Sequence, residues 1–233
     1  MTSRNDTEEV TGMPVAIITG ASRGLGLALA HGLSDAGWGL VLDARGAEDL
    51  RTAADQLDGP VRAIPGDITD PDHRAELVEA ATELGGLDLL VNNAGVLGPS
   101  PLPALAEFPL DRLREVYEVN VLAQLALTQQ ALPTLLARDG AVVFVTSDAA
   151  VEPYPGWGGY GSAKAALEQI GKVLAVEAPA LRVWVVDPGD LRTKMHQDAF
   201  PGEDISDRQL PEAVVPAYVK LVTERPESGR VRL

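Results

Sequence analysis

The segment from Val15 to Ala30 constrains the fold most, because it passes from a strand through a glycine turn into a helix. Its first residues are apolar and rich in β-branched side chains, which indicates a buried strand. The turn holds Gly20, Gly24 and Gly26, and the apolar stretch that follows has no Gly or Pro until Gly32, which indicates a helix. A glycine turn at a helix N-terminus can cradle a phosphate. The spacing Gly-x-x-x-Gly-x-Gly differs from the general dinucleotide fingerprint, so the motif alone also fits a purely structural turn.

Length and charge narrow the class of protein. The 233 residues suit one domain with a sizeable core, and the net charge of −15 argues against nucleic acid or anionic membranes as partners. There is no Cys, and His31, His73 and His196 lie far apart in the sequence, so we expect neither disulfides nor a metal site. Residues 1–12 are polar without an apolar signal core, and no apolar run is long enough to span a bilayer. We therefore expect a disordered lead-in over residues 1–12 and a cytoplasmic protein.

Strand and helix patterns alternate along the chain. Strands are predicted from residue 15 and at 40–43, 61–64, 87–91, 141–146, 181–186 and 230–233. Further helices are predicted at 47–57, 71–84 with Asp70 as cap, 110–137 with an interruption near Pro133, 159–176 and 211–223, and residues 191–210 are expected to be irregular. The fold class is therefore α/β, and residues 13–233 are expected to form a single Rossmann-like domain. Its parallel sheet would be doubly wound, with six to seven strands and helices on both faces.

Polar residues and glycines follow the predicted strands, at the sheet edge where ligands of such folds bind. The residues in these positions are Gly20, Arg45, Asp67, Asn93, Ser147 and Pro188. Their placement predicts one ligand-binding edge that draws on most of the chain.

Tyr160 and Lys164 carry the clearest chemical signal. Residues four apart share a helix face, so both side chains would project into the same cleft. A nearby cation favours the phenolate and lowers the pKa of a Tyr from about 10, which makes it a usable acid or base. Ser147, thirteen residues before Tyr160, could hold a carbonyl oxygen beside the phenol. Taken alone, the pair also fits a solvated helix face, and Asn120 also fits a helix residue with an ordinary hydrogen-bond partner.

Several motifs occur together in a fixed order between about residues 15 and 193. They are Thr19-Gly20-Ala-Ser-Arg-Gly24-Leu-Gly26, Asp67, Asn92-Asn93-Ala94-Gly95, Asn120, Ser147, Tyr160-x-x-x-Lys164 and Pro188-Gly189-x-x-x-Thr193. In order and spacing the chain resembles the classical short-chain dehydrogenase/reductase family. No single motif is specific, but the joint match is.

The resemblance implies a catalytic tetrad of Asn120, Ser147, Tyr160 and Lys164. Ser147 would orient the substrate carbonyl or hydroxyl, and Tyr160 would pass the proton. Lys164 would bind the nicotinamide ribose and depress the Tyr160 pKa, and Asn120 would hold a water that links Lys164 to solvent. The nicotinamide would carry the hydride.

The resemblance also implies which residues bind the dinucleotide. Asp67 would meet the adenine, residues 93–95 would line the cleft, and the segment that starts at Pro188 would meet the nicotinamide. The full set is Gly20, Ser22, Arg23, Gly24, Leu25, Gly26, Arg45, Asp67, Ile68, Asn93, Ala94, Gly95, Tyr160, Lys164, Pro188, Gly189, Leu191 and Thr193.

Charge near the second predicted strand indicates the cofactor. Enzymes that prefer NAD place an acidic residue at the end of this strand, whereas here Ala44 fills that place, followed by Arg45. Arg23 in the glycine loop would add a second cation, and two Arg suit the 2′-phosphate of NADP(H). Asp43 should point away from the ribose by strand alternation, but an alignment shifted by one residue would reverse the preference.

The substrate pocket is predicted to be mostly apolar or aromatic. Its candidate walls are Val96, Leu97, Tyr154, Trp157, Met195 and Phe200, with His196 at the surface. These residues suit a hydrophobic ketone or aldehyde, although the aromatic ones could equally pack a lid. Residues 191–210 would form that flexible lid.

Two features depart from the family pattern. Residues 228–233 lack the usual glycine-rich continuation, so a homodimer through the segments 110–137 and 159–176 is favoured over a homotetramer. Asp148 stands where a small neutral residue is usual, and it either perturbs the site or points away.

The prediction for function is an NADP(H)-dependent oxidoreductase that transfers a hydride between nicotinamide and a small-molecule carbonyl or secondary alcohol, with Tyr160 as general acid or base. A non-catalytic NADP-binding or regulatory protein on the same fold is the alternative. Lyase or epimerase chemistry is less favoured.

Overall fold

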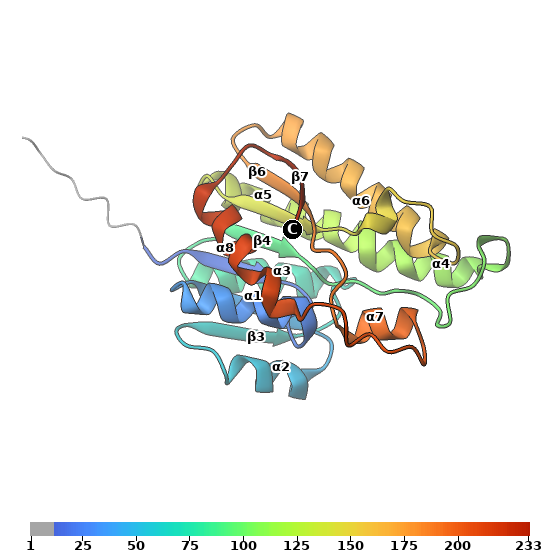
Figure 1. The fold of residues 1–233 in the computed structure, drawn as a ribbon. Helices are drawn as coiled ribbons and strands as arrows, with labels where there is room; N and C mark the ends of the chain where they lie inside the picture. The colour runs from blue at the N-terminus through green and yellow to red at the C-terminus, as the bar shows by residue number, and fades with distance from the viewer. Residues whose placement is uncertain (1–11) are drawn as a thin grey trace, which may run out of the picture.

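A single parallel sheet of seven strands organises the protein, in the order β3-β2-β1-β4-β5-β6-β7 (Figure 1). The computed structural model describes residues 12–233, so residues 1–11 of the predicted lead-in lie outside it. The strands are β1 (Val15–Ile18), β2 (Gly39–Ala44), β3 (Val61–Pro65), β4 (Leu89–Asn92), β5 (Ala141–Val145), β6 (Arg182–Asp187) and β7 (Gly229–Arg232). This confirms the predicted doubly wound α/β fold.

Helices cover both faces of the sheet, as Figure 1 shows. The helices are α1 (Gly24–Asp35), α2 (Ala47–Ala54), α3 (Pro71–Glu83), α4 (Leu110–Tyr117), α5 (Ala123–Leu136), α6 (Gly158–Glu177), α7 (Lys194–Ala199) and α8 (Val215–Glu224). Helices α1, α2 and α8 pack on one face, and α3, α5 and α6 pack on the other. Within the described residues, no helix has the length and apolar content needed to cross a bilayer.

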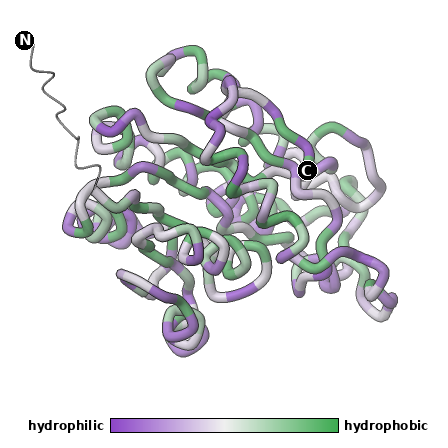
Figure 2. The backbone as a smooth tube through the Cα atoms, turned by 60° about the vertical axis from the view of Figure 1, so that its left-hand side comes forward, coloured by the Kyte–Doolittle hydropathy of each residue, from purple (hydrophilic) through white to green (hydrophobic). Residues whose placement is uncertain are grey.

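Alternating side chains of the central strands belong to two separate hydrophobic cores, one on each face of the sheet. Ala16 and Ile18 of β1 belong to the core beneath α1 and α8, whereas Val15 and Ile17 belong to the core beneath α3 and α5. All four are fully buried, because a parallel sheet covered on both sides leaves its central strands no solvent face. The hydrophobic stretches in Figure 2 accordingly run along the central strands.

The strand order reverses between β1 and β4, which are neighbours in the sheet. The loops after these two strands therefore leave in opposite directions and open a crevice at the carboxyl ends of the strands. The glycine loop follows β1, and Asn93 follows β4. The fold thus brings two of the predicted cofactor motifs to one place.

The long helical segment differs from its predicted form. The sequence predicts an interruption near Pro133, but Pro133 lies inside the continuous helix α5. The irregular turn lies earlier, at Glu118–Leu122, where the chain forms a π-helical turn between α4 and α5. Asn120 is at the centre of that turn, and its side chain makes a long-range contact described below.

Two further segments can be compared with their predictions. Asp70 caps α3 as expected: its Oδ1 accepts a hydrogen bond from the Asp72 amide at 2.9 Å, and Pro71 starts the helix. The segment 191–210 is not wholly irregular, because it contains the short helix α7 capped by Thr193. A bridge between Leu191 and Gln209 joins the two ends of this segment.

Candidate active site

The loop between β1 and α1 has the backbone of a phosphate cradle. Gly20 and Gly24 adopt φ values of +67° and +57°, a region that side-chain-bearing residues rarely adopt. Helix α1 begins at Gly24, and its cap residue Arg23 provides no side-chain hydrogen bond to the first turn. The amides of that turn therefore remain available for an anion at the positive end of the helix dipole.

The Asn93 side chain holds this loop in place through hydrogen bonds to its backbone. Its Nδ2 donates hydrogen bonds to the carbonyl oxygens of Thr19 at 2.8 Å and Gly20 at 3.2 Å. A Cβ atom on Gly26 would collide with the Gly20 carbonyl oxygen and lie 2.7 Å from that Nδ2 atom. The glycine at position 26 is thus required by close packing, and the Asn93 side chain is engaged by the loop backbone. The sequence motif predicts Asn93 at the cleft but not this supporting role.

Thr19 joins the loop to the next strand. Its Oγ1 accepts hydrogen bonds from the amides of Asn93 at 3.0 Å and Ala94 at 2.9 Å, and donates to the carbonyl of Val91 at 3.2 Å. This fully buried hydroxyl fixes the ends of β1 and β4 against each other.

Asp43 points toward α3, on the face of β2 opposite to Ala44, as strand alternation predicts. It is 2% exposed, and its Oδ1 lies 2.6 Å from Nε2 of the buried His73. Its Oδ2 accepts a hydrogen bond from the Gly20 amide at 3.4 Å. The carboxylate raises the pKa of the His73 imidazole above its ordinary value. The sequence predicts the direction of Asp43, but nothing in it indicates His73 as the partner.

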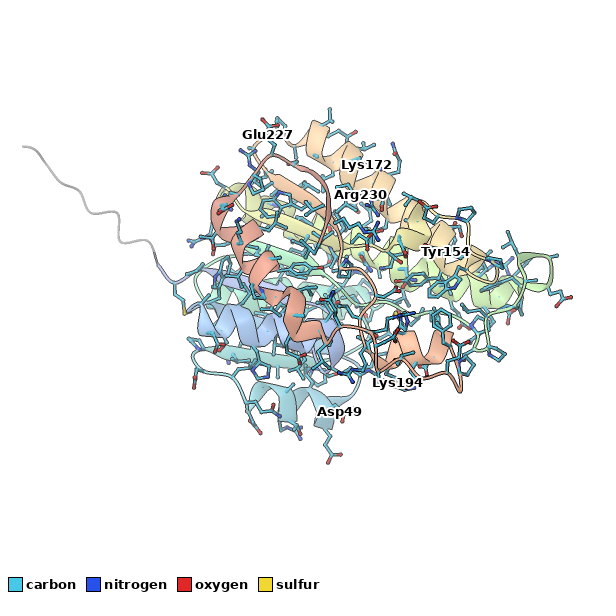
Figure 3. The ribbon with its side chains drawn as sticks, in the orientation of Figure 1. Asp49, Tyr154, Lys172, Lys194, Glu227 and Arg230 are labelled. Carbon is cyan, nitrogen blue, oxygen red and sulfur yellow. The ribbon has the colours of Figure 1, made fainter. Side chains whose placement is uncertain are left out.

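Two cations, one directly after β2 and one in the glycine loop, are exposed. Arg45 directly follows β2, and Arg23 precedes α1, and both are exposed. A hollow of about 300 Å³ lies beside Arg23, lined by Ser22, Arg23, Leu27, Asp49, Thr52, Ala53 and Gln56. Figure 3 shows Asp49 of α2 on this side of the molecule.

Asp67 and Ile68 follow β3, at the predicted adenine end. The Asp67 Oδ1 accepts hydrogen bonds from the Thr69 amide at 2.9 Å and the Thr69 hydroxyl at 2.8 Å. The amide bond is the main cause of a lowered pKa for the Asp67 carboxyl. Ile68 is buried, and its carbonyl accepts a hydrogen bond from Arg74 at 2.7 Å. Asp67 is therefore a carboxylate at neutral pH, held in place by a local turn.

Tyr160 and Lys164 lie on one face of α6, as the spacing predicts, but both are buried. Their exposed fractions are 8% and 2%, and the Lys164 Nζ lies 5.5 Å from the centre of the Tyr160 ring. Lys164 donates a hydrogen bond to the Val145 carbonyl at 2.8 Å. Helix α6 packs closely on the turn after β5, since a Cβ on Gly161 would collide with the Ala149 carbonyl oxygen.

The pKa of Tyr160 corrects one sequence-based expectation. The sequence predicts that Lys164 lowers it, whereas burial, followed by the negative charges of Asp148 and Asp187, raises it. Burial also lowers the pKa of Lys164 to about 8. The sequence shows that the two side chains are neighbours, but it does not show how completely they are removed from water.

Asn120 is fully buried in the π-helical turn. Its Oδ1 accepts a hydrogen bond from the Val96 amide, and its Nδ2 donates one to the Val96 carbonyl, both at 2.8 Å. Asn120 therefore holds the loop after β4 against the helix, a contact that its sequence position did not reveal. The predicted water between Asn120 and Lys164 remains a prediction.

Asp148 reaches into the site and does not point away. Ser147 caps the 3-10 turn Asp148–Ala150, accepting a hydrogen bond from the Ala149 amide at 3.2 Å. The Ser147 hydroxyl donates to Asp148 Oδ1 at 3.1 Å, and the Tyr154 hydroxyl donates to Asp148 Oδ2 at 3.0 Å. Figure 3 shows Tyr154 just before α6, on the side of the molecule where α7 lies. The one unusual residue of the motif therefore contacts the predicted substrate-orienting hydroxyl directly.

The segment after β6 lies over the glycine loop. A Cβ on Gly24 would lie 3.5 Å from the Thr193 Cγ2 atom, although the two residues are far apart in sequence. Gly189 adopts φ +70°, and its amide donates a hydrogen bond to Asp187 Oδ1 at 3.1 Å. Leu191 is buried in the core beneath α1. Thr193 therefore lies beside the cradle, and the contact of Pro188, Gly189, Leu191 and Thr193 with the nicotinamide stays a prediction.

Most of the predicted substrate residues gather around Tyr160. Residues packed in one cluster with Tyr160 are Leu97, Leu102, Ala149, Trp157, Met195, Ala199 and Phe200. Trp157 lies edge-on to Tyr160 with ring centres 5.8 Å apart, and 6.0 Å from the Phe200 ring. Val96 instead packs in a neighbouring cluster beneath α4. Leu102, in the loop before α4, was missed by the sequence analysis.

Comparison with known proteins agrees with this geometry. The family model described as short chain dehydrogenase matches residues 14–204. The chain is 37% identical over 192 residues to 1-deoxy-11-beta-hydroxypentalenate dehydrogenase from Streptomyces arenae, covering 77% of this chain and 68% of that one. It is 35% identical over 182 residues to serine 3-dehydrogenase from Agrobacterium fabrum, covering 76% and 72%.

A solved structure extends the similarity to the whole fold. The short-chain dehydrogenase from Shigella flexneri 2a, complexed with NADP, superposes with a TM-score of 0.87 at 30% identity, covering 95% of this chain and 96% of that one. The glycine cradle, the Tyr160–Lys164 pair, the sequence match and the fold all agree. The chain belongs to the classical short-chain dehydrogenase/reductase family.

Proposed function

We propose that the protein is an NADP(H)-dependent oxidoreductase that interconverts a small-molecule ketone or aldehyde and the corresponding alcohol. The observation that carries the proposal is the buried pair of Tyr160 and Lys164 on α6, packed against the turn that begins at Ser147. The family model that matches the chain is described as short chain dehydrogenase, and the two relatives above are named as dehydrogenases. A regulatory protein would have no need of a proton donor and a cation together in this buried position.

The residues present fit a dinucleotide. The first turn of α1 has uncapped amides, and Gly26 leaves no room for a side chain between the helix and the loop. A pyrophosphate would bind these amides, and a bound nicotinamide would supply the hydride. Lys164 would contact the adjoining ribose, and the stretch from Pro188 to Thr193 would line that end.

The protein's own residues would handle the proton. The Ser147 hydroxyl would donate a hydrogen bond to the substrate oxygen, and the Tyr160 hydroxyl would give that oxygen its proton during reduction. The neighbouring Lys164 ammonium would stabilise the phenolate left behind. Reprotonation of Tyr160 would complete the cycle, and oxidation would run these steps in reverse.

NADP(H) is preferred in this proposal because Arg45 and Arg23 are exposed where the 2′-phosphate would lie, whereas Asp43 is engaged by His73 and the loop. Bound cofactors of similar folds do not decide the choice, since such structures hold NADP in one case and NADH in another.

Replacing Arg45 with Asp should weaken NADPH binding relative to NADH by about tenfold or more. Calorimetric titration of both cofactors measures the ratio, and an unchanged ratio would contradict the assignment.

Tyr160→Phe tests the proposed chemistry. The change removes the hydroxyl and keeps the ring that packs on Trp157. NADPH oxidation with a panel of ketones, aldehydes and quinones should fall by about 10²- to 10⁴-fold, because general acid catalysis is lost. The dissociation constant for NADPH should stay within about twofold, since the phosphate cradle is untouched. Full activity in the variant would show that Tyr160 is not the proton donor. Wild-type binding of NADPH without turnover of any compound would favour the non-catalytic alternative.

A further inference from the structure

The charged side chain of Asp148 is in direct contact with Ser147. Both of its carboxylate oxygens accept hydrogen bonds from hydroxyls, one from Ser147 at 3.1 Å and one from Tyr154 at 3.0 Å. Asp148 therefore forms a hydrogen bond with the hydroxyl that is proposed to contact the substrate oxygen.

The Asp148 carboxylate forms no ion pair within residues 12–233. No Lys, Arg or His nitrogen of these residues lies within 4.0 Å of it. Arg208 pairs instead with Asp190 at 3.5 Å and with Asp207 at 2.7 Å. Burial lowers the pKa of His196 against the opposite effect of nearby carboxylates, Asp148 among them, so burial disfavours a charged imidazole there.

The uncompensated charge is unfavourable for the proposed chemistry. It is one of the causes that raise the pKa of Tyr160, so it disfavours the phenolate that reduction would leave. It also accepts the hydrogen bond that the Ser147 hydroxyl would otherwise donate to the substrate oxygen. A positive group arriving with the substrate would relieve both effects, because it would neutralise the carboxylate and compete with Ser147 for it.

The surroundings of Asp148 suit such a group. Tyr154 contacts Asp148 through its hydroxyl. Trp157 and Phe200 lie in the cluster around Tyr160, with 6.0 Å between their ring centres. Aromatic faces together with a carboxylate are the chemistry that recognises alkylammonium ions. A neutral ketone would leave the carboxylate without a cationic partner, and a keto acid would be repelled.

We propose that Asp148 is a specificity-determining residue that selects substrates with a protonated amine one or two carbons from the reacting carbon, namely amino ketones and the corresponding amino alcohols. The short spacing follows from geometry, because Ser147 would contact the reacting oxygen and lies one hydrogen bond from the carboxylate. This inference rests on the proposed reductase function and names its substrate class.

Three compounds with the same three-carbon skeleton test it by turnover at pH 7: aminoacetone, hydroxyacetone and pyruvate. The wild type should reduce aminoacetone with a kcat/KM about tenfold above that for hydroxyacetone, and pyruvate least well. In Asp148→Asn the advantage of aminoacetone should shrink to less than about threefold, while hydroxyacetone turnover is kept or raised because the charge beside Tyr160 is gone. Glu152→Gln is the matched control, since it removes an exposed carboxylate from the same loop and should keep the preference.

A binding measurement separates this inference from the function on which it rests. Calorimetry on the complex with the more tightly bound reduced cofactor compares 1-amino-2-propanol with 1,2-propanediol, neither of which can transfer a hydride to a reduced nicotinamide. The amine should bind about tenfold more tightly in the wild type and in Glu152→Gln, and no more tightly than the diol in Asp148→Asn.

The outcomes are distinguishable. An Asp148-dependent amine preference without any turnover would support the inference and contradict the reductase function. Turnover of neutral ketones that depends on Tyr160, with no amine preference or with equal preference in Asp148→Asn, would overturn the inference and leave the function standing. Absence of measurable amine binding would also overturn it.

Discussion

Tyr160, Lys164 and His73 are all buried, yet their pKa values shift for different reasons. Burial and two negative charges raise that of Tyr160, burial alone lowers that of Lys164, and the Asp43 carboxylate raises that of His73 against the effect of burial. Strand alternation predicts the direction of Asp43. The partner of Asp43 and the depth of burial of the other groups depend on long-range packing that no local pattern encodes.

The His73–Asp43 pair should make stability depend on pH. Because the folded-state pKa of His73 is raised above its ordinary 6.5, its contribution is fully present below pH 6.5 and is lost as the pH rises through the raised value. The free energy of unfolding should fall by about 1 kcal/mol for each unit by which the pKa is raised. Urea denaturation from pH 5.5 to 9 measures it, with His73→Gln as control because Gln keeps a neutral donor. The same pH dependence in both proteins would mean that another group is responsible.

Two glycines of helix α1 have different surroundings, so substitutions at them should affect cofactor binding and protein stability differently. A Cβ on Gly26 would collide with the backbone carbonyl of Gly20 in the cradle, whereas a Cβ on Gly32 would collide with the Val215 side chain of α8. The Gly20 backbone is held by hydrogen bonds and cannot move without its loop, whereas the Val215 side chain can partly adjust to an added methyl group. The two positions therefore lie on the same helix with different consequences.

Gly26→Ala should weaken NADPH binding by at least about tenfold, because the cradle must shift away from the phosphate. Gly32→Ala should leave the dissociation constant within about twofold and lower the free energy of unfolding by about 1–2 kcal/mol, since overpacking outweighs the gain in helix propensity. Isothermal titration and urea denaturation of both variants measure these effects. If both variants lost NADPH affinity equally, the loss would come from a change of the whole helix α1 and not from the cradle alone.

Sequence patterns predicted the order of the elements, but not the irregularity in the long helical segment. Pro133 is the stronger local signal for a break, yet α5 accommodates it. The π-helical turn forms where Asn120 pairs with the backbone of Val96, a contact between residues distant in the sequence. For the same reason, motifs suffice to propose Asn120, Ser147, Tyr160 and Lys164 as a tetrad, whereas the contacts of Asn93 and Asp148 required the structure.

At the scale of the whole molecule, apolar side chains remain exposed on the helices proposed to form a dimer. They are Leu110, Leu122, Leu136, Val173 and Val176, with exposed fractions between 40% and 80%. Burying such a surface between two copies removes apolar area from water. We infer that two copies associate through the α4–α5 and α6 surfaces.

Leu122→Glu should convert the dimer into a monomer, because it places a charge on this surface without a partner. Leu210→Glu is the control, since Leu210 is similarly exposed, at 50% against 52%, but lies outside these helices. Size-exclusion chromatography with light scattering gives the mass of each variant. A dimer that survives Leu122→Glu, or is lost equally in Leu210→Glu, would place the interface elsewhere.

Strand β7 supplies a positive charge to two buried carboxylates. Arg230 donates hydrogen bonds at 3.0 Å to Glu168 on α6 and to Asp187 at the end of β6. The ribosome delivers both carboxylates before Arg230, so they gain this partner only when β7 docks. Docking of β7 therefore ties α6 and the end of β6 together, and we expect it to make this edge of the sheet more resistant to unfolding.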